Sequence, residues 1–141
     1  MEFDSNNPVI QLCVNGMEME AQNPAEAKSL FLQAWNEAAS DFEKFTAAHY
    51  VARHQPNVTE KLKWDEIALS FALKINDSSM QTNYPSLYLN IGKCYEELND
   101  IENAEKNYQF ALSYATHLPA DGYGQMIRGG IDKALQRISA N

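Results

Sequence analysis

Apolar residues along this chain of 141 residues recur at steps of three and four, which is the spacing of side chains on one face of an α-helix. Stripes of this kind begin near positions 9, 27, 42, 67, 91, 101 and 127, with turn residues between them. No segment shows the period-two alternation of an exposed strand. The pattern therefore predicts an all-α chain of about seven helices.

Helix starts are marked by residues whose side chains cap the first turn. Three of them combine an N-cap residue with a glutamate three positions later, and these pairs are Asn23 with Glu26, Ser40 with Glu43, and Asn57 with Glu60. Asp100 is the predicted N-cap of a later helix. Residues 67–75 are apolar nearly all round, so this stretch is predicted to lie at the centre of a stack.

Segment 85–115 predicts a helical hairpin. Two antiparallel helices approach closely only where side chains are small, and Gly92 and Ala104 are predicted to face each other across a short turn at Asn99-Asp100. Asn99 is expected to take the left-handed conformation there. Three tyrosines supply the large side chains that fill the space around this contact, namely Tyr88, Tyr95 and Tyr108.

The same segment resembles a tetratricopeptide repeat, a unit of about 34 residues that forms a helix–turn–helix. The matching residues are Tyr88, Ile91, Gly92 and Tyr95 on the first helix, then Ala104, Tyr108, Ala111 and Leu112 on the second. Asn99 stands where the family usually has glycine, and Thr116 stands in place of the family's terminal proline. The resemblance implies a right-handed superhelix, or α-α solenoid, of about three hairpins plus a C-terminal capping helix.

On this reading residues 1–141 form a single domain. Residues 1–39 are a degenerate repeat, because Gly16 falls one residue out of step, and residues 40–76 are a stretched hairpin. Residues 85–118 are the well-matched repeat. Residues 121–139 are the capping helix, whose predicted apolar stripe is Ile127, Ile131, Ala134, Leu135 and Ile138, with Lys133, Gln136 and Arg137 outside.

Charge and cysteine usage narrow the classes of partner and compartment. With 19 acidic and 11 basic residues the net charge is −8, so neither nucleic acid nor an anionic membrane surface is an expected partner. Cys13 and Cys94 have no metal or disulfide spacing, and are expected to be reduced and buried. The acidic N-terminal residues lack the features of a secretory signal, and we expect a soluble cytoplasmic protein.

Motifs of enzymes and metal sites are absent from the sequence. There is no phosphate-binding loop, nucleophile elbow or HExxH helix. His49 and His54 are five residues apart, which places them about 140° from each other around a helix, so they cannot chelate one metal from a single face. The acidic residues between Glu96 and Glu105 are expected to form a solvated face. No catalytic residue, metal or cofactor is predicted.

In proteins with this repeat the first helices of successive hairpins line a concave groove. The resemblance therefore implies partner contacts at Phe45, His49, Arg53, Leu89, Asn90, Lys93 and Glu97. Asn90 and Lys93 stand where carboxylate-clamp members of the family hold a peptide's terminal carboxylate. The alternative is that Lys93 and Arg53 only solvate the surface and pair with Glu97 or other acids.

The predicted function is a non-catalytic scaffold that binds a protein or peptide in a shallow groove. One alternative is a small enzyme, or the accessory domain of an RNA-modifying enzyme, built from His49, Arg53, Asp65 and Tyr84. A further alternative is weak self-association through the apolar face of an end hairpin.

Overall fold

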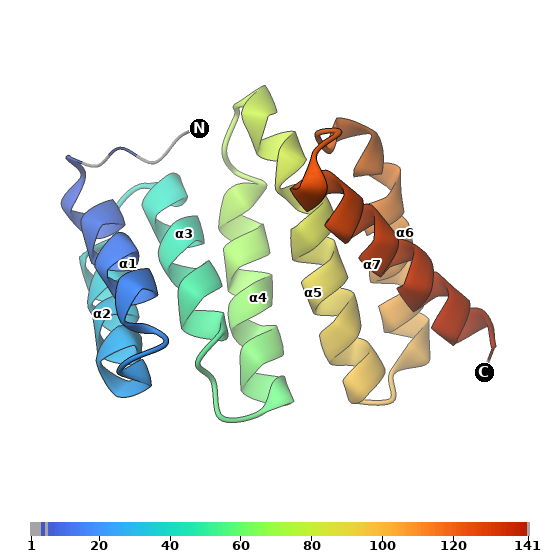
Figure 1. Ribbon diagram of the computed structural model, residues 1–141, viewed down its shortest axis with the longest axis horizontal. Helices are drawn as coiled ribbons and strands as arrows, with labels where there is room; N and C mark the ends of the chain where they lie inside the picture. The colour runs from blue at the N-terminus through green and yellow to red at the C-terminus, as the bar shows by residue number, and fades with distance from the viewer. Residues whose placement is uncertain (1–3, 5, 141) are drawn as a thin grey trace. The chain divides into compact units, whose positions relative to one another are not determined.

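A computed structural model describes residues 4 and 6–140 of the chain (Figure 1). Within these residues every regular element is a helix, so the all-α prediction and the predicted number of helices are confirmed. The α-helices are α1 (Pro8–Met19), α2 (Pro24–Glu37), α3 (Asp41–Ala52), α4 (Val58–Ala72), α5 (Tyr84–Glu97), α6 (Ile101–Ser113) and α7 (Gly122–Ser139), and two short 3-10 helices are η1 (Ser78–Thr82) and η2 (Ala115–His117).

The chain divides into two compact units. The first comprises residues 1–76 and contains α1 to α4, and the second comprises residues 77–141 and contains α5 to α7 with both 3-10 helices. The division falls at the start of the polar segment 76–83 between the predicted hairpins. None of the helices in the described part of the chain combines the length and apolar character that a membrane span requires.

Side-chain caps fix where most of the helices begin. The predicted N-caps are confirmed, since Asn23, Ser40, Asn57 and Asp100 each accept a hydrogen bond from the backbone N–H three residues later. The box at Ser40 is complete, because the Glu43 carboxylate accepts in return from the Ser40 N–H. Glu26 behaves differently, because its carboxylate accepts from the side-chain amide of Asn23. Local sequence therefore sets these helix starts.

An aromatic ring packed on a glycine organises the first unit. The ring of Phe31 on α2 lies directly against Gly16 on α1, where any Cβ would collide with it. Phe31 is fully buried, and its ring stacks on Tyr50 of α3 with centroids 5.1 Å apart. Ala27 and Ala34, on the same face of α2, are fully buried as well. The ring thus joins α1, α2 and α3.

The second unit repeats this contact. The ring of Tyr108 on α6 lies against Gly92 on α5, where a Cβ would stand 2.5 Å from Tyr108 Cε1. Ala104 and Ala111 flank Tyr108 at the same spacing as the alanines around Phe31, and both are fully buried. The sequence had suggested that Ala104 faces Gly92, but the atoms nearest to Gly92 belong to Tyr108. The turn is as predicted, with Asn99 left-handed at φ 63°.

A glutamate four residues after each glycine links the hairpin to a third helix. Glu20 forms an ion pair with Arg53, with 3.3 Å between the guanidinium nitrogen and the carboxylate oxygen, and its other oxygen lies 2.9 Å from His54 Nε2. Glu96 accepts two hydrogen bonds from Arg137 of α7, both at 3.1 Å. These bonds hold the pKa of the Glu96 carboxyl below its usual value.

The tyrosine ring of the second unit is tied to the same carboxylate. The Tyr108 hydroxyl donates to Glu96 at 2.7 Å. Burial of the phenol and the neighbouring Glu96 carboxylate raise the pKa of Tyr108 far above its ordinary value. Tyr108 therefore stays protonated, and remains a hydrogen-bond donor, over the whole range in which proteins fold.

Two details of burial differ from the pattern expected from the sequence. Within residues 67–75 only Ala68 and Ala72 are buried, and Leu73 is 50% exposed, so this stretch is not covered on all sides. Leu112, one of the matched repeat residues, is 43% exposed.

The stripe predicted for the last helix is confirmed, with Leu135 partly buried and its other four members buried, while Lys133, Gln136 and Arg137 face outward.

The packing of Tyr108 on Gly92 predicts that Gly92→Ala costs roughly 1–3 kcal/mol of unfolding free energy, because the added methyl overpacks a buried ring. The matched control is Gly129→Ala in the middle of α7, where a Cβ meets no atom within 4 Å. That change should be neutral or stabilise by up to about 1 kcal/mol through helix propensity. Urea unfolding followed by circular dichroism measures both, and equal effects of the two substitutions would contradict the ring–glycine contact.

Candidate partner-binding surface

Helix α5 exposes a single polar row. Most of its circumference is buried, through Tyr84, Pro85, Leu87, Leu89, Ile91, Gly92 and Cys94. Of the residues that are not buried, Tyr88 and Tyr95 pack partly against the core and Glu96 bonds Tyr108 and Arg137. The other four recur at steps of four, three and four, which places them on one face, and they are Ser86, Asn90, Lys93 and Glu97. We call these four residues the polar row. Its position is fixed by the packing of the other faces of α5.

The polar groups of this row are largely uncommitted. Lys93 and Glu97 are exposed and Asn90 is half-buried, and none of these three side chains forms a hydrogen bond or ion pair within the part of the chain that the structure describes. Ser86 donates from its hydroxyl to the carbonyl oxygen of Asn83 at 3.1 Å. The i, i+4 pair of Lys93 with Glu97, which the alternative interpretation expects, is therefore not formed.

Leu89 does not belong to this open surface. It is 4% exposed and lies in the core of the second unit together with Ile131 of α7. A Cβ on Gly130 would stand 3.1 Å from the Leu89 Cδ2 atom, so α7 passes directly over this side chain. The expected contact between Leu89 and a partner is thus corrected, because Leu89 already packs against the last helix.

The three residues predicted on α3 lie along one side of that helix but differ in availability. Phe45 is only 8% exposed, and its ring centroid is 6.4 Å from that of His49. Arg53 is 47% exposed, yet it pairs with Glu20 and lies 5.4 Å from the ring centroid of Tyr50. For Arg53 the structure therefore shows the paired surface residue of the alternative interpretation.

His49 has an unusual environment for a histidine near the surface. Its Nδ1 atom is enclosed and has no hydrogen-bond partner, and the ring packs edge-on against Tyr50 with centroids 5.1 Å apart. Burial lowers the pKa of His49 below its ordinary value, since it penalises the charged imidazolium. Asp65 opposes this shift, while Arg53 and Lys61 add to it. Asp65 itself is buried and accepts from Lys61 at 2.7 Å.

The residues of the alternative enzymatic interpretation do not all come from one unit. His49, Arg53 and Asp65 belong to the first unit, whereas Tyr84 belongs to the second, where its ring meets that of Tyr114 at 5.0 Å. Among the residues that the structure describes, no group of three or more histidine, cysteine or acidic side chains is arranged to hold a metal ion. Both cysteines are buried free thiols, and burial raises the pKa of Cys13 to about 11.

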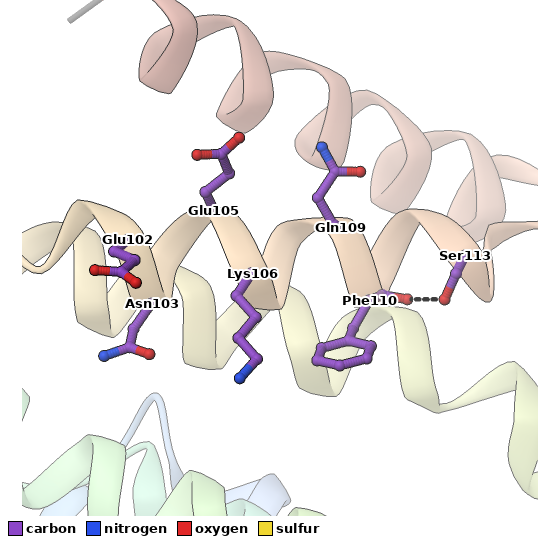
Figure 2. Close-up of a pocket in the computed structure, with 7 residues that line it drawn as sticks. All are labelled: Glu102, Asn103, Glu105, Lys106, Gln109, Phe110 and Ser113. Carbon is purple, nitrogen blue, oxygen red and sulfur yellow. Dashed lines mark hydrogen bonds between the residues drawn. The ribbon is translucent and has the colours of Figure 1, made fainter.

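Two shallow hollows accompany α6. The first, of about 650 Å³, is lined by α6 alone, through Glu102, Asn103, Glu105, Lys106, Gln109, Phe110 and Ser113. Figure 2 shows that these side chains diverge, with Glu105 and Gln109 on the side of α7 and Lys106 and Phe110 on the other. The second, of about 480 Å³, lies between α6 and α7. Neither brings ionisable groups together as a catalytic cleft does.

Two features were not identified from the sequence. Ser86 extends the polar row by one turn, and its spacing of four from Asn90 is the signal that would have revealed it. The other is a cluster of Trp35, Trp64 and Phe71 with two lysines in the first unit. Trp64 and Phe71 are seven residues apart on α4, which places them on one face, but their partner Trp35 comes from a different helix.

No protein-family model matches the chain, and the comparisons with curated proteins and with solved structures also give no match.

The environment of His49 predicts a loss of stability in mild acid. Its folded pKa is depressed, so its contribution is fully present above the unfolded pKa of about 6.5 and is lost as pH falls through the folded pKa. The slope from one such group is at most about 1.4 kcal/mol per pH unit. The free energy of unfolding is measured in urea at several pH values from about 7.5 to about 5, which lie roughly one to two pH units on either side of that pKa. It should depend less steeply on pH for His49→Leu than for the wild type.

The control for this prediction is His117→Leu, because His117 is an exposed histidine in the second unit. It should keep the wild-type pH dependence. If His49→Leu and the wild type lose stability in parallel on acidification, His49 is not held neutral by its burial.

Proposed function

We propose that this chain is a non-catalytic interaction module that holds a peptide or a partner's helix, with the polar row of α5 as a contact surface. The tetratricopeptide-like character of residues 85–118 is part of the proposal, because in that family the first helix of a hairpin lines the binding groove. The proposal concerns Asn90, Lys93 and Glu97 first, since they are the predicted site residues that are accessible and unpaired.

The observation that carries the proposal is the contrast between the row and the rest of α5. The rest of this helix supplies buried side chains and the half-buried Tyr88, Tyr95 and Glu96, which pack or bond within the unit. The row instead presents a cation, an anion and an amide that form no hydrogen bond or ion pair within the described residues. Lys93 and Glu97 are at the spacing at which oppositely charged residues commonly pair, and they do not. Their hydrogen-bonding capacity is therefore free for another molecule.

The rigidity of the support strengthens this argument. α5 is held by Tyr108 on Gly92, by Leu89 beneath α7 and by the hydrogen bonds from Arg137 to Glu96. Side chains on a helix that is already fixed lose less freedom on binding than side chains on a mobile loop, so less binding free energy is spent on ordering. A row of this kind suits recognition of an extended or helical peptide by a few polar contacts.

The expected partner is a protein or peptide, and the expected location is the cytoplasm. Asn90 and Lys93 offer an amide and an ammonium, which together suit a peptide carboxylate. The net charge of −8 disfavours a polyphosphate partner. Both cysteines are free thiols, as is usual for proteins of reducing compartments.

A binding experiment on defined peptides tests the polar row. Peptides are selected from a random display library against the intact protein, and their affinities are then measured by calorimetry for the wild type and for Lys93→Ala. Loss of an anchoring residue costs 2 kcal/mol or more, so the affinity of peptides held by the row should fall about thirtyfold.

The matched control is Lys106→Ala on α6, which removes the same charge from an exposed helical position outside the row. It should change affinity by less than about threefold, in keeping with the small contribution of exposed charges. Selected peptides whose binding ignores Lys93→Ala, or responds equally to both substitutions, would remove the polar row from the binding surface.

A further inference from the structure

A second surface with free cationic groups lies in the first unit, whereas the polar row belongs to the second. It consists of Trp35 on α2, Lys44 on α3, Trp64 and Phe71 on α4, and Lys74 just after α4, and we call it the aromatic–lysine patch. All three rings are half-buried, so each keeps part of its surface in contact with solvent. The five residues come together from three helices and belong to one compact unit.

The rings of the patch pack edge to face. The centroids of Trp35 and Trp64 are 5.1 Å apart with an interplanar angle of 89°, and those of Trp35 and Phe71 are 6.1 Å apart at 65°. Edge-to-face packing of this kind fixes the orientation of large side chains. The rings therefore present a preformed apolar surface.

Two ammonium groups lie against these rings. Lys44 Nζ is 5.4 Å from the ring centroid of Trp35 and 5.5 Å from that of Phe71, and Lys74 Nζ is 4.8 Å from Phe71. Both distances to Phe71 are in the range of cation–π attraction. The two cations therefore share one aromatic ring.

Neither ammonium group has an anionic partner within the described residues, since Lys44 and Lys74 form no ion pair or side-chain hydrogen bond there. Other lysines, such as Lys63 and Lys106, also form no ion pair within the described residues, but Lys44 and Lys74 are the lysines that lie over an aromatic ring there. Arg53 provides the comparison, because it too lies over an aromatic ring, that of Tyr50, but also pairs with Glu20. The rings attract the lysine charges without using their N–H donors, which remain free to bind carboxylates.

The charges and rings of the patch indicate the kind of partner that it would bind. Two ammonium donors beside half-buried aromatic rings suit a segment in which acidic side chains flank an aromatic one, because the acids meet the lysines and the ring packs on the rings. Three acidic residues, Glu37, Asp41 and Glu43, lie close in sequence to Trp35 and Lys44. They would repel a continuous phosphate backbone more strongly than a short peptide with few charges. These features favour a peptide over a nucleic acid.

We propose that the aromatic–lysine patch is a second docking surface, which binds an acidic peptide segment containing an aromatic residue through ion pairs to Lys44 and Lys74. This surface is separate from the polar row and does not depend on the function proposed for that row.

Tryptophan fluorescence of the full chain tests the proposal directly, because both tryptophans of the sequence lie in the patch. The probes are short synthetic peptides with one phenylalanine or tyrosine between aspartates and glutamates, in every register of acid and ring. At least some of them should change the tryptophan emission saturably. The Lys44→Gln, Lys74→Gln double variant should weaken their binding about fivefold or more, as expected for the loss of two partly exposed ion pairs.

Controls separate this result from general electrostatics. The Lys28→Gln, Lys63→Gln double variant removes the same charge from exposed positions of α2 and α4 outside the patch, and should bind as the wild type does. Peptides with lysine in place of the acids, or alanine in place of the ring, should bind several times more weakly. Circular dichroism confirms that each variant is folded, and calorimetry measures binding independently of emission.

Several outcomes would overturn the proposal. These are no saturable response from any acidic aromatic peptide, equal binding of the lysine-containing peptides, and equal weakening by the two double variants. Tighter binding of a single-stranded oligouridylate would replace the peptide by nucleic acid as the partner. Loss of binding in Lys93→Ala would assign these peptides to the polar row.

Discussion

The packing of one aromatic ring on one glycine determines how each half of this chain is built. A glycine lets two helix backbones approach until a ring from the second helix covers the first, and the ring then reaches a third helix as well. Phe31 does this for α1, α2 and α3, and Tyr108 does it between α5 and α6 while bonding the carboxylate that α7 holds. Both rings are fully buried.

The ring–glycine contact occurs in both units with the same sequence spacing, but the groups that bond the nearby glutamate differ between them. In each unit an N-cap residue lies eight positions before the ring, and a glutamate lies four positions after the glycine. In the second unit the ring itself carries the hydroxyl that binds the glutamate, and an arginine completes the bond. In the first unit the ring is a phenylalanine, and His54 takes the place of the hydroxyl beside Glu20. The equivalence therefore extends from backbone packing to the third-helix contact.

Features set by neighbouring residues in the chain were predictable from the sequence. The N-caps at Ser40, Asn57 and Asp100 and the left-handed Asn99 all depend on interactions within a few residues, so the residue types alone indicate them. Gly92 was also identifiable as the point of closest approach. The partner of Gly92 was not, because Ala104 and Tyr108 lie one turn apart on the same face of α6 and both satisfy the pattern.

Features set by contacts between distant segments could not be derived in this way. Leu89 looks accessible on a helical wheel, but α7 covers it from about forty positions further along the chain, which no local pattern reports. Arg53 looks like a free basic residue until Glu20, at the end of α1, pairs with it. Of the seven predicted contact residues, the three that remain accessible and unpaired lie on one face of α5. Their positions follow from local periodicity, but their lack of partners could be seen only in the folded chain.

The same distinction explains why the aromatic–lysine patch of the first unit could not be predicted from the sequence. Arg53 and Lys44 both lie on aromatic rings, yet only Arg53 has a carboxylate within reach. A paired guanidinium adds little to binding, since a partner's acid must first compete with the internal one. An ammonium held by rings alone meets no such competition, and the rings fix its position before a partner arrives. The availability of a charge for binding is thus decided by what packs beside it rather than by its sign or exposure.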